Sequence, residues 1–170
     1  TVANLAPEII SLATSESIVD EGTQITLTGT LADAGALDTH TVTIDWGDMS
    51  VNAVVSVDAT TRSFTTTHVF DDDDAAGALA LAQGAGLFTI TAIATDNDGA
   101  ISSAASTDVV VENVAPSFVP VIDGADVYAF DLDATSIIEN DVLSLTGTVN
   151  DPSFGDTHSL TVNWGDGSAE

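Results

Sequence analysis

The sequence predicts an all-β protein, an antiparallel sandwich of immunoglobulin-like architecture, and three observations support this fold class. Apolar residues alternate with Thr and Ser over short segments, as they do in strands with one buried face. No segment keeps apolar residues three and four apart for long enough to predict a helix. Turn-forming Asp, Asn and Gly residues separate the segments at the short intervals typical of a sandwich.

The expected strands are short and follow one another along the chain. We predict them near residues 8–13, 24–31, 40–46, 51–58, 62–68, 87–95 and 103–111. Their apolar positions alternate with polar ones and should face the core; they include Ile25, Leu27, Leu31, Val42, Ile44, Trp46, Phe88, Ile90, Ala92, Ala94, Val109 and Val111. Residues 75–86, rich in Ala, Gly and Leu, are the least strand-like, and we expect a loop or a short helix there.

The chain also repeats itself. Residues 38–50 return as residues 156–168 at an offset of 118, whereas Asn4-Leu5-Ala6-Pro7 returns as Asn113-Val114-Ala115-Pro116 at an offset of 109. The difference predicts an insertion of nine residues early in the second copy. A repeat of this length is a tandem domain, because solenoid repeats run to only about 20 to 50 residues. We therefore expect a complete domain at 1–112 and the N-terminal half of a second at 113–170.

Charge limits the partners. One basic residue, Arg62, stands against 27 acidic residues, and the formal net charge is -26. Such a field repels nucleic acids and anionic lipids, so we expect cations as ligands instead. Adaptation to salt also produces acidic, Lys-poor surfaces, and that explanation stays open beside metal binding. The chain has no Cys, which excludes Cys-bound zinc and Cys nucleophiles, and no apolar run reaches the roughly 18 residues of a membrane span.

The histidines and tryptophans favour structural roles. His40 and His158 occupy the same position in the two copies, and a residue duplicated in a tandem array is more often structural than catalytic. We expect these two rings and that of His68 to be satisfied by hydrogen bonds. Trp46 and Trp164 end alternating strands, where an indole is expected in the core rather than on an exposed sugar platform. No Gly-x-Ser-x-Gly elbow is present, and we predict no enzyme.

Four segments in a fixed order resemble the PKD-type (polycystic kidney disease-like) domain. They are Asp45-Trp46-Gly47-Asp48, His68-Val69-Phe70, Gly86-Leu87-Phe88-Thr89-Ile90-Thr91 and Ala94-Thr95-Asp96-Asn97-Asp98-Gly99. The departures from the family pattern are mild, since Met49 stands where Gly is expected and Phe70 and Phe88 stand for Tyr. The resemblance covers the first copy and the front half of the second. It implies an immunoglobulin-like module of a large bacterial protein that is secreted or carried on the cell surface.

The resemblance further implies where Ca²⁺ would bind. In PKD-type domains that bind calcium, the ligands come from the N-terminal linker, the turn after the second strand and the late Asp-x-x-Gly turn. The matching residues are Asn4, Asp33, Asp96 and Asp98 in the first copy, and Asn113 and Asp151 in the second. Independently, Asp96 and Asp98 can face one ion while Gly99 permits a sharp turn. The four Asp residues at 71–74 stay open between a cation site and a solvated loop.

Together these observations predict a non-catalytic spacer and adhesion module, stiffened by calcium, whose partners are neighbouring domains of the same protein. Two alternatives stay open. One is an accessory carbohydrate-binding module of a secreted polysaccharide hydrolase, which would need exposed aromatic side chains. The other is a filament or surface-layer subunit in which strands of an identical chain complete the second copy. Because that copy lacks its later strands, we expect it to be ordered only when something covers its apolar face.

Overall fold

The computed structural model describes residues 3–75, 77–81, 84–119, 121–123, 126–128, 131–132, 138 and 142–165. The chain divides into two compact units, Thr1–Val114 and Ala115–Glu170. All regular structure in the described residues is β-strand, which confirms the all-β class. In this part of the chain no helix is long and apolar enough to cross a membrane.

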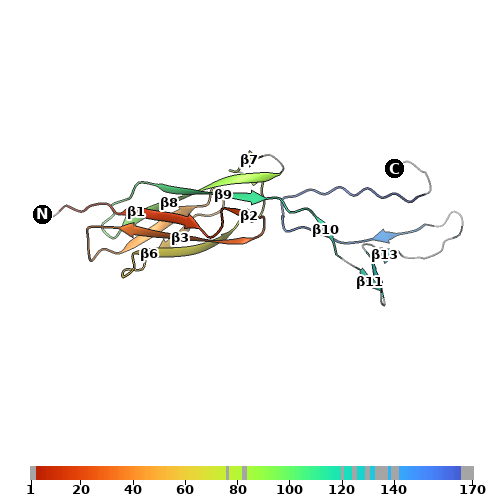
Figure 1. Ribbon diagram of the computed structural model, residues 1–170, viewed down its shortest axis with the longest axis horizontal. Coiled ribbons are helices and arrows are strands. Elements are labelled where there is room, and N and C mark those ends of the chain that lie inside the picture. Colours follow the sequence, from red (N-terminus) through yellow and green to blue (C-terminus); the bar gives the residue numbers. More distant parts are fainter. Residues whose placement is uncertain are drawn as a thin grey trace. The chain divides into compact units, whose positions relative to one another are not determined.

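The first unit is a sandwich of two sheets (Figure 1). One sheet has the order β1 (Glu8–Thr14), β3 (Gln24–Ala32), β6 (Ser63–Val69), and all its pairs are antiparallel. The other has the order β2 (Ile18–Asp20), β9 (Ala105–Glu112), β8 (Ala85–Asp96), β4 (His40–Asp45), β5 (Ala53–Ser56), and β7 (Leu79–Leu81) also pairs with β8. The seven predicted strands are all present, with ends that differ by a few residues.

The core lies between the two sheets and is built from the alternating positions. Its buried apolar residues are Val19, Ile25, Leu27, Leu31, Val42, Ile44, Trp46, Phe64, Phe70, Phe88, Ile90, Ala92, Ala94, Val109 and Val111. Trp46 is 2% exposed, so its predicted place in the core is confirmed, whereas the same prediction is wrong for Trp164, which is 47% exposed. The Trp46 indole stacks on the His68 ring at 4.3 Å, which joins the end of β4 to β6 of the opposite sheet.

Two short strands were not predicted. β2 pairs in parallel with β9, so the chain leaves the first sheet after β1 and crosses at once to the second. β7 lies within residues 75–86, where a loop or short helix was expected, and pairs antiparallel with β8. Three residues are too few to show an alternating pattern, and both strands are defined by the partner that they meet in the fold.

The second unit repeats the register of the first at its start. Phe118 pairs with Val149 as Ile9 pairs with Leu31, and Leu132 pairs with Leu145 as Thr14 pairs with Leu27. The strands of this unit are β10 (Ser117–Phe118), β11 (Val121–Asp123), β12 (Asp126–Tyr128), β13 (Asp131–Leu132), β14 (Leu145–Thr146) and β15 (Val149–Asn150).

The antiparallel pair β11–β12 lies between the two strands that replace β1. In the first unit, the register of β1 shifts between Ile9 and Ser11, which marks a bulge at the same place. A bulge already interrupts the ladder, so a hairpin can be inserted there without moving the paired residues on either side. This accounts for the nine residues that separate the two repeat offsets.

Candidate metal centre

The residues predicted to bind calcium in the first copy meet at one end of the first unit. Asn4, in the segment before β1, donates from Nδ2 to Asp96 Oδ2 at 2.8 Å. Asp33 follows β3, and Asp96 ends β8. One carboxylate oxygen from each of Asp33, Asp38 and Asp96 lies within 4.8 Å of the other two. Asp98 lines a shallow cleft beside Asn4 and Asp38. Asp38 was missed, because no turn signal in the sequence marks it as a ligand.

The Asp33 carboxylate is fixed by the loop that it begins. Its Oδ1 accepts the Gly35 amide at 2.6 Å, and its Oδ2 lies 2.9 Å from His40 Nε2. The Asp33 side chain is only 1% exposed. The hydrogen bond from His40, followed by that from the Gly35 amide, lowers the pKa of Asp33 despite burial. This carboxyl is therefore ionised at neutral pH.

Arg62 determines the tautomer of His40. Its Nη1 lies 2.9 Å from His40 Nδ1, and because a guanidinium only donates, Nδ1 must accept. The ring proton is then on Nε2, which donates to Asp33. Arg62 also donates to Gly35 O at 2.9 Å. The only Lys or Arg residue of the chain thus holds the loop 33–40 and places one positive charge on the side of the His40 ring away from Asp33.

Asp96 is held as an anion by a different set of donors. Burial raises the pKa of Asp96. Hydrogen bonds from the Asn4 side-chain amide and from the Ala100 and Asp98 backbone amides lower this pKa by more, so the net shift is downward. Since His40 pairs with Asp96 across β4 and β8, the sheet register itself brings this carboxylate to the His40–Asp33 pair. Asp96 Oδ1 already accepts two amides, but Asp96 Oδ2 accepts only the Asn4 side chain and each Asp33 oxygen has one hydrogen-bond partner. These oxygens retain a lone pair, so the cluster can still accept a hard cation.

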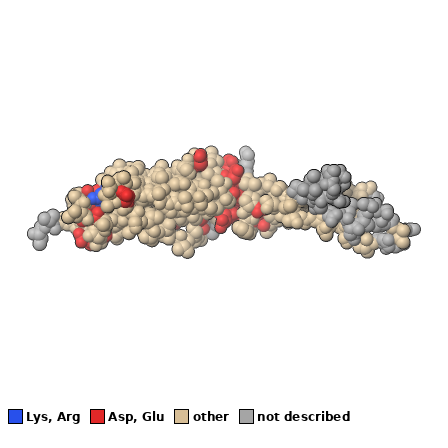
Figure 2. Space-filling model, turned by 90° about the horizontal axis from the view of Figure 1, so that it is seen from below, with Lys and Arg blue, Asp and Glu red and all other residues tan. Residues whose placement is uncertain are grey.

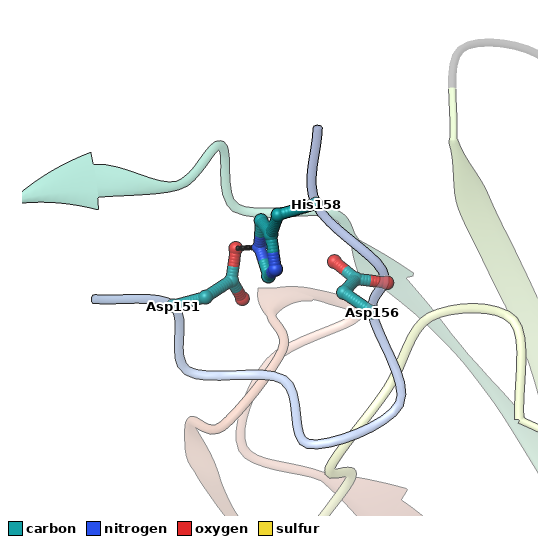
Figure 3. A group of neighbouring side chains, drawn as sticks. All are labelled: Asp151, Asp156 and His158. Carbon is teal, nitrogen blue, oxygen red and sulfur yellow. Dashed lines mark hydrogen bonds and ion pairs between the residues drawn. The ribbon is translucent and has the colours of Figure 1, made fainter. Parts of the chain in front are cut away.

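The second copy contains the same loop. His158 Nε2 lies 3.0 Å from Asp151 Oδ2, and Asp151 Oδ1 accepts the Ser153 amide at 2.9 Å. Figure 3 shows Asp151 and His158 facing each other, with Asp156 across from them. Ligand atoms of these three residues lie within 4.8 Å of one another, as in the first copy. Asn113 belongs to the first unit, where its backbone amide donates to Gly84 O, and Asp151 belongs to the second.

The opposite end of the first unit has an acidic cluster of its own, which includes two of the four Asp residues at 71–74 and, unexpectedly, Glu21. Glu21 is 2% exposed, and its Oε1 accepts the Val114 amide at 2.8 Å. Carboxylate oxygens of Glu21, Asp72 and Asp73 lie within 4.8 Å of one another. Figure 2 shows acidic side chains gathered mainly at the two ends of the first unit. In the sequence Glu21 was part of a turn signal, and nothing in a turn signal indicates burial.

All three histidines are hydrogen-bonded to an aspartate, which confirms the prediction that hydrogen bonds satisfy their rings. The third pair joins His68 Nε2 to Asp48 Oδ2 at 2.7 Å. Asp48 also accepts the Ser50 amide, so it closes the turn after Trp46 while it orients the ring that stacks on this indole. This pair stabilises the core, and it is separate from the cluster of Asp33, Asp38 and Asp96.

The chain matches no protein-family model, and no curated protein or solved structure is significantly similar to it. The role of the carboxylate cluster therefore has to be inferred from its own geometry.

Proposed function

We propose that this chain is a non-catalytic, PKD-like tandem module of a large extracellular bacterial protein and serves as a semi-rigid spacer stiffened by calcium. One observation carries the proposal: buried carboxylates tie down the chain at both ends of the first unit. Asp96 holds the side chain of Asn4 where the chain enters, and Glu21 holds the amide of Val114 where it leaves.

The two tied segments are the two copies of one linker. Asn4 and Asn113 begin the same four-residue motif, which ends in Pro7 and Pro116. On leaving the first unit, the backbone of Asn113 donates to Gly84 and that of Val114 donates to Glu21. Proline restricts its own backbone and that of the residue before it. A linker this short, anchored at its start and restricted at its end, favours a spacer over a flexible joint.

Calcium is the cation that suits the cluster at the entering segment. The neighbouring ligand atoms of Asp33, Asp38 and Asp96 are all carboxylate oxygens, and the chain has no Cys. Hard oxygen ligands in a flexible arrangement are typical of calcium rather than of zinc or copper. Three carboxylates beside a single guanidinium repel one another, and a divalent ion would relieve that repulsion. Because Asn4 binds Asp96, the ion would also fix the entering segment.

The proposal can be tested by the distance between the entering segment and the rest of the first unit. The native chain has no Cys, so spin labels on Leu5→Cys, in the entering segment, and Val51→Cys, in an exposed loop, would report a single distance. We expect a narrow distance distribution in calcium and a broader one in chelator. The matched variant Asp96→Asn should give the broad distribution in both conditions. A broad distribution that calcium leaves unchanged would contradict the spacer.

A carbohydrate-binding role is the second candidate, and Trp164 is the observation that favours it. Trp46 is enclosed in the core, whereas Trp164 is 47% exposed and could stack on a sugar ring. A shift of tryptophan fluorescence on addition of a soluble polysaccharide, lost in Trp164→Phe, would support this role. An unchanged spectrum would count against it.

A further inference from the structure

The second unit presents an apolar face, and the corresponding face of the first unit is buried. The residues that line one cleft on this face include Leu143, Leu145, Leu160, Val162 and Trp164. Leu160 is 56% exposed, and Trp164 is nearly half exposed. A contiguous patch of large apolar side chains on a soluble unit is typical of a surface that binds a partner.

The repeat shows which residues of the first unit correspond to this face and what covers them there. At the offset of 118 the five positions correspond to Ile25, Leu27, Val42, Ile44 and Trp46, which are all buried. There β8 pairs antiparallel with β4 and brings Phe88 and Ile90 into the shared core. The two sets contain the same total number of side-chain carbon atoms, because Leu160 and Val162 exchange the sizes of Val42 and Ile44. The two faces therefore offer a strand the same total apolar volume, with one carbon more at Leu160 and one fewer at Val162.

The backbone of the second unit is open at the same place. Residues 158–163, which repeat β4, form no ladder with any other described residue. In the first unit, the corresponding residues pair with β5 on one side and β8 on the other. Unpaired strand groups beside an apolar face are a template for an added strand.

We propose that this face is the acceptor for an extended, uncharged strand with the chemistry of β8, bound antiparallel to residues 158–163. In the register of β4 and β8, small residues such as Ala94 and Ala92 would lie opposite Leu160 and Val162. Charge restricts the partner as well, because a net charge of -26 repels acidic segments while residues 85–95 carry no charge.

A second folded copy of the chain is not the occupant. Its own β8 is paired on both sides, with β4 and with β9, and Phe88 and Ile90 are completely buried. To donate β8, a copy would have to open its entire core. The acceptor face therefore takes a strand that is not already part of a sandwich, and this inference does not depend on calcium or on the spacer role.

A peptide of residues 85–95, carrying a neutral solubilising handle, tests the proposal on the full chain. Acrylamide quenching reports mainly on Trp164, because Trp46 is buried. On saturation with the peptide, we expect the quenching slope to fall to that of the Trp164→Phe variant, in which only Trp46 emits. The matched control is the same peptide with Asn at the positions of Phe88 and Ile90, which should have no effect. Leu160→Asn in the chain should weaken binding, whereas the outward Ser159→Asn should not.

Three outcomes would overturn the proposal. An unchanged slope with the native peptide would show that the face accepts no such strand. Equal effects of the two peptides would show that binding does not use the apolar pattern. A concentration-dependent dimer in which Trp164 is already shielded would show that the occupant is a second copy.

Discussion

The loops 33–40 and 151–158 have the same local structure in different surroundings. In both, an aspartate binds the amide two residues later and the histidine seven residues later, with Asp–His distances of 2.9 and 3.0 Å. The histidine side chain is 2% exposed in the first copy and 33% exposed in the second. The first loop meets Arg62 and Asp96, which the later strands supply, whereas none of the described residues takes their place in the second.

The comparison separates two levels of structure. The Asx turn and the Asp–His hydrogen bond join residues that are close in sequence, so the local chain can form them alone. The charge environment of the loop depends on Arg62, in the turn before β6, and on Asp96 of β8. Only the complete sandwich turns this local motif into a buried cluster of charges.

The largest expected effect concerns Trp46 and Trp164, which occupy the same position in the two copies. Trp46→Ala should lower the free energy of unfolding by about 3 to 5 kcal/mol, because it leaves a cavity between the sheets. Trp164→Ala should cost far less, because its ring is half exposed. Chemical denaturation of both variants of the full chain measures the difference. Equal losses would show that the second unit has a core of its own.

Calcium should act on the first copy. At 100 times the dissociation constant, an ion that binds only the folded state adds roughly 2.7 kcal/mol to the free energy of unfolding. Thermal melting in calcium and in chelator, at low salt, tests this. Asp96→Asn should abolish the shift, and Asp151→Asn should leave the transition of the first unit unchanged. Identical melting temperatures for the native chain in both conditions would exclude calcium.

Arg62→Gln makes the first loop resemble the second. It removes the donors to His40 Nδ1 and Gly35 O, and losing partners of buried groups costs about 1 to 3 kcal/mol. The same change removes the positive charge that lies across the His40 ring from Asp33, so calcium should bind more tightly. Denaturation without calcium and calorimetric titration measure the two effects. A variant that is as stable as the native chain would show that the loop does not need its guanidinium.

The smallest expected effect concerns acid. Folding lowers the pKa values of Asp33 and Asp96, so these groups stabilise the folded state above the ordinary value of about 3.9. That contribution is lost as the pH falls from there through the lowered values. Asp33→Asn should flatten the acid dependence of the free energy of unfolding, measured without calcium. A profile as steep as that of the native chain would place the acid-sensitive groups elsewhere.

Much of the first unit could be predicted from its sequence. Alternation placed Val42, Ile44 and Trp46 on one buried face, and this pattern survives folding because a strand has only two faces. β2 and β7 could not be predicted in this way, because each is defined by its partner, β9 or β8. For the cluster, the motif resemblance pointed to Asn4, Asp33 and Asp96, and the fold brings them together. Asp38 and Glu21 carry no sequence signal that distinguishes them from other acidic residues.

The sequence by itself determined the strand pattern, the repeat and the local hydrogen bonds of the loops at Asp33 and Asp151, because each depends on residues only a few positions apart. The tertiary structure decided which carboxylates are buried and what they hold. Glu21 reaches the Val114 amide, and Asp96 reaches Asn4, only because β8 and β9 bring distant parts of the chain to the two ends of one sandwich. Burial and the field between charges depend on distance in space, which the order of residues alone does not give.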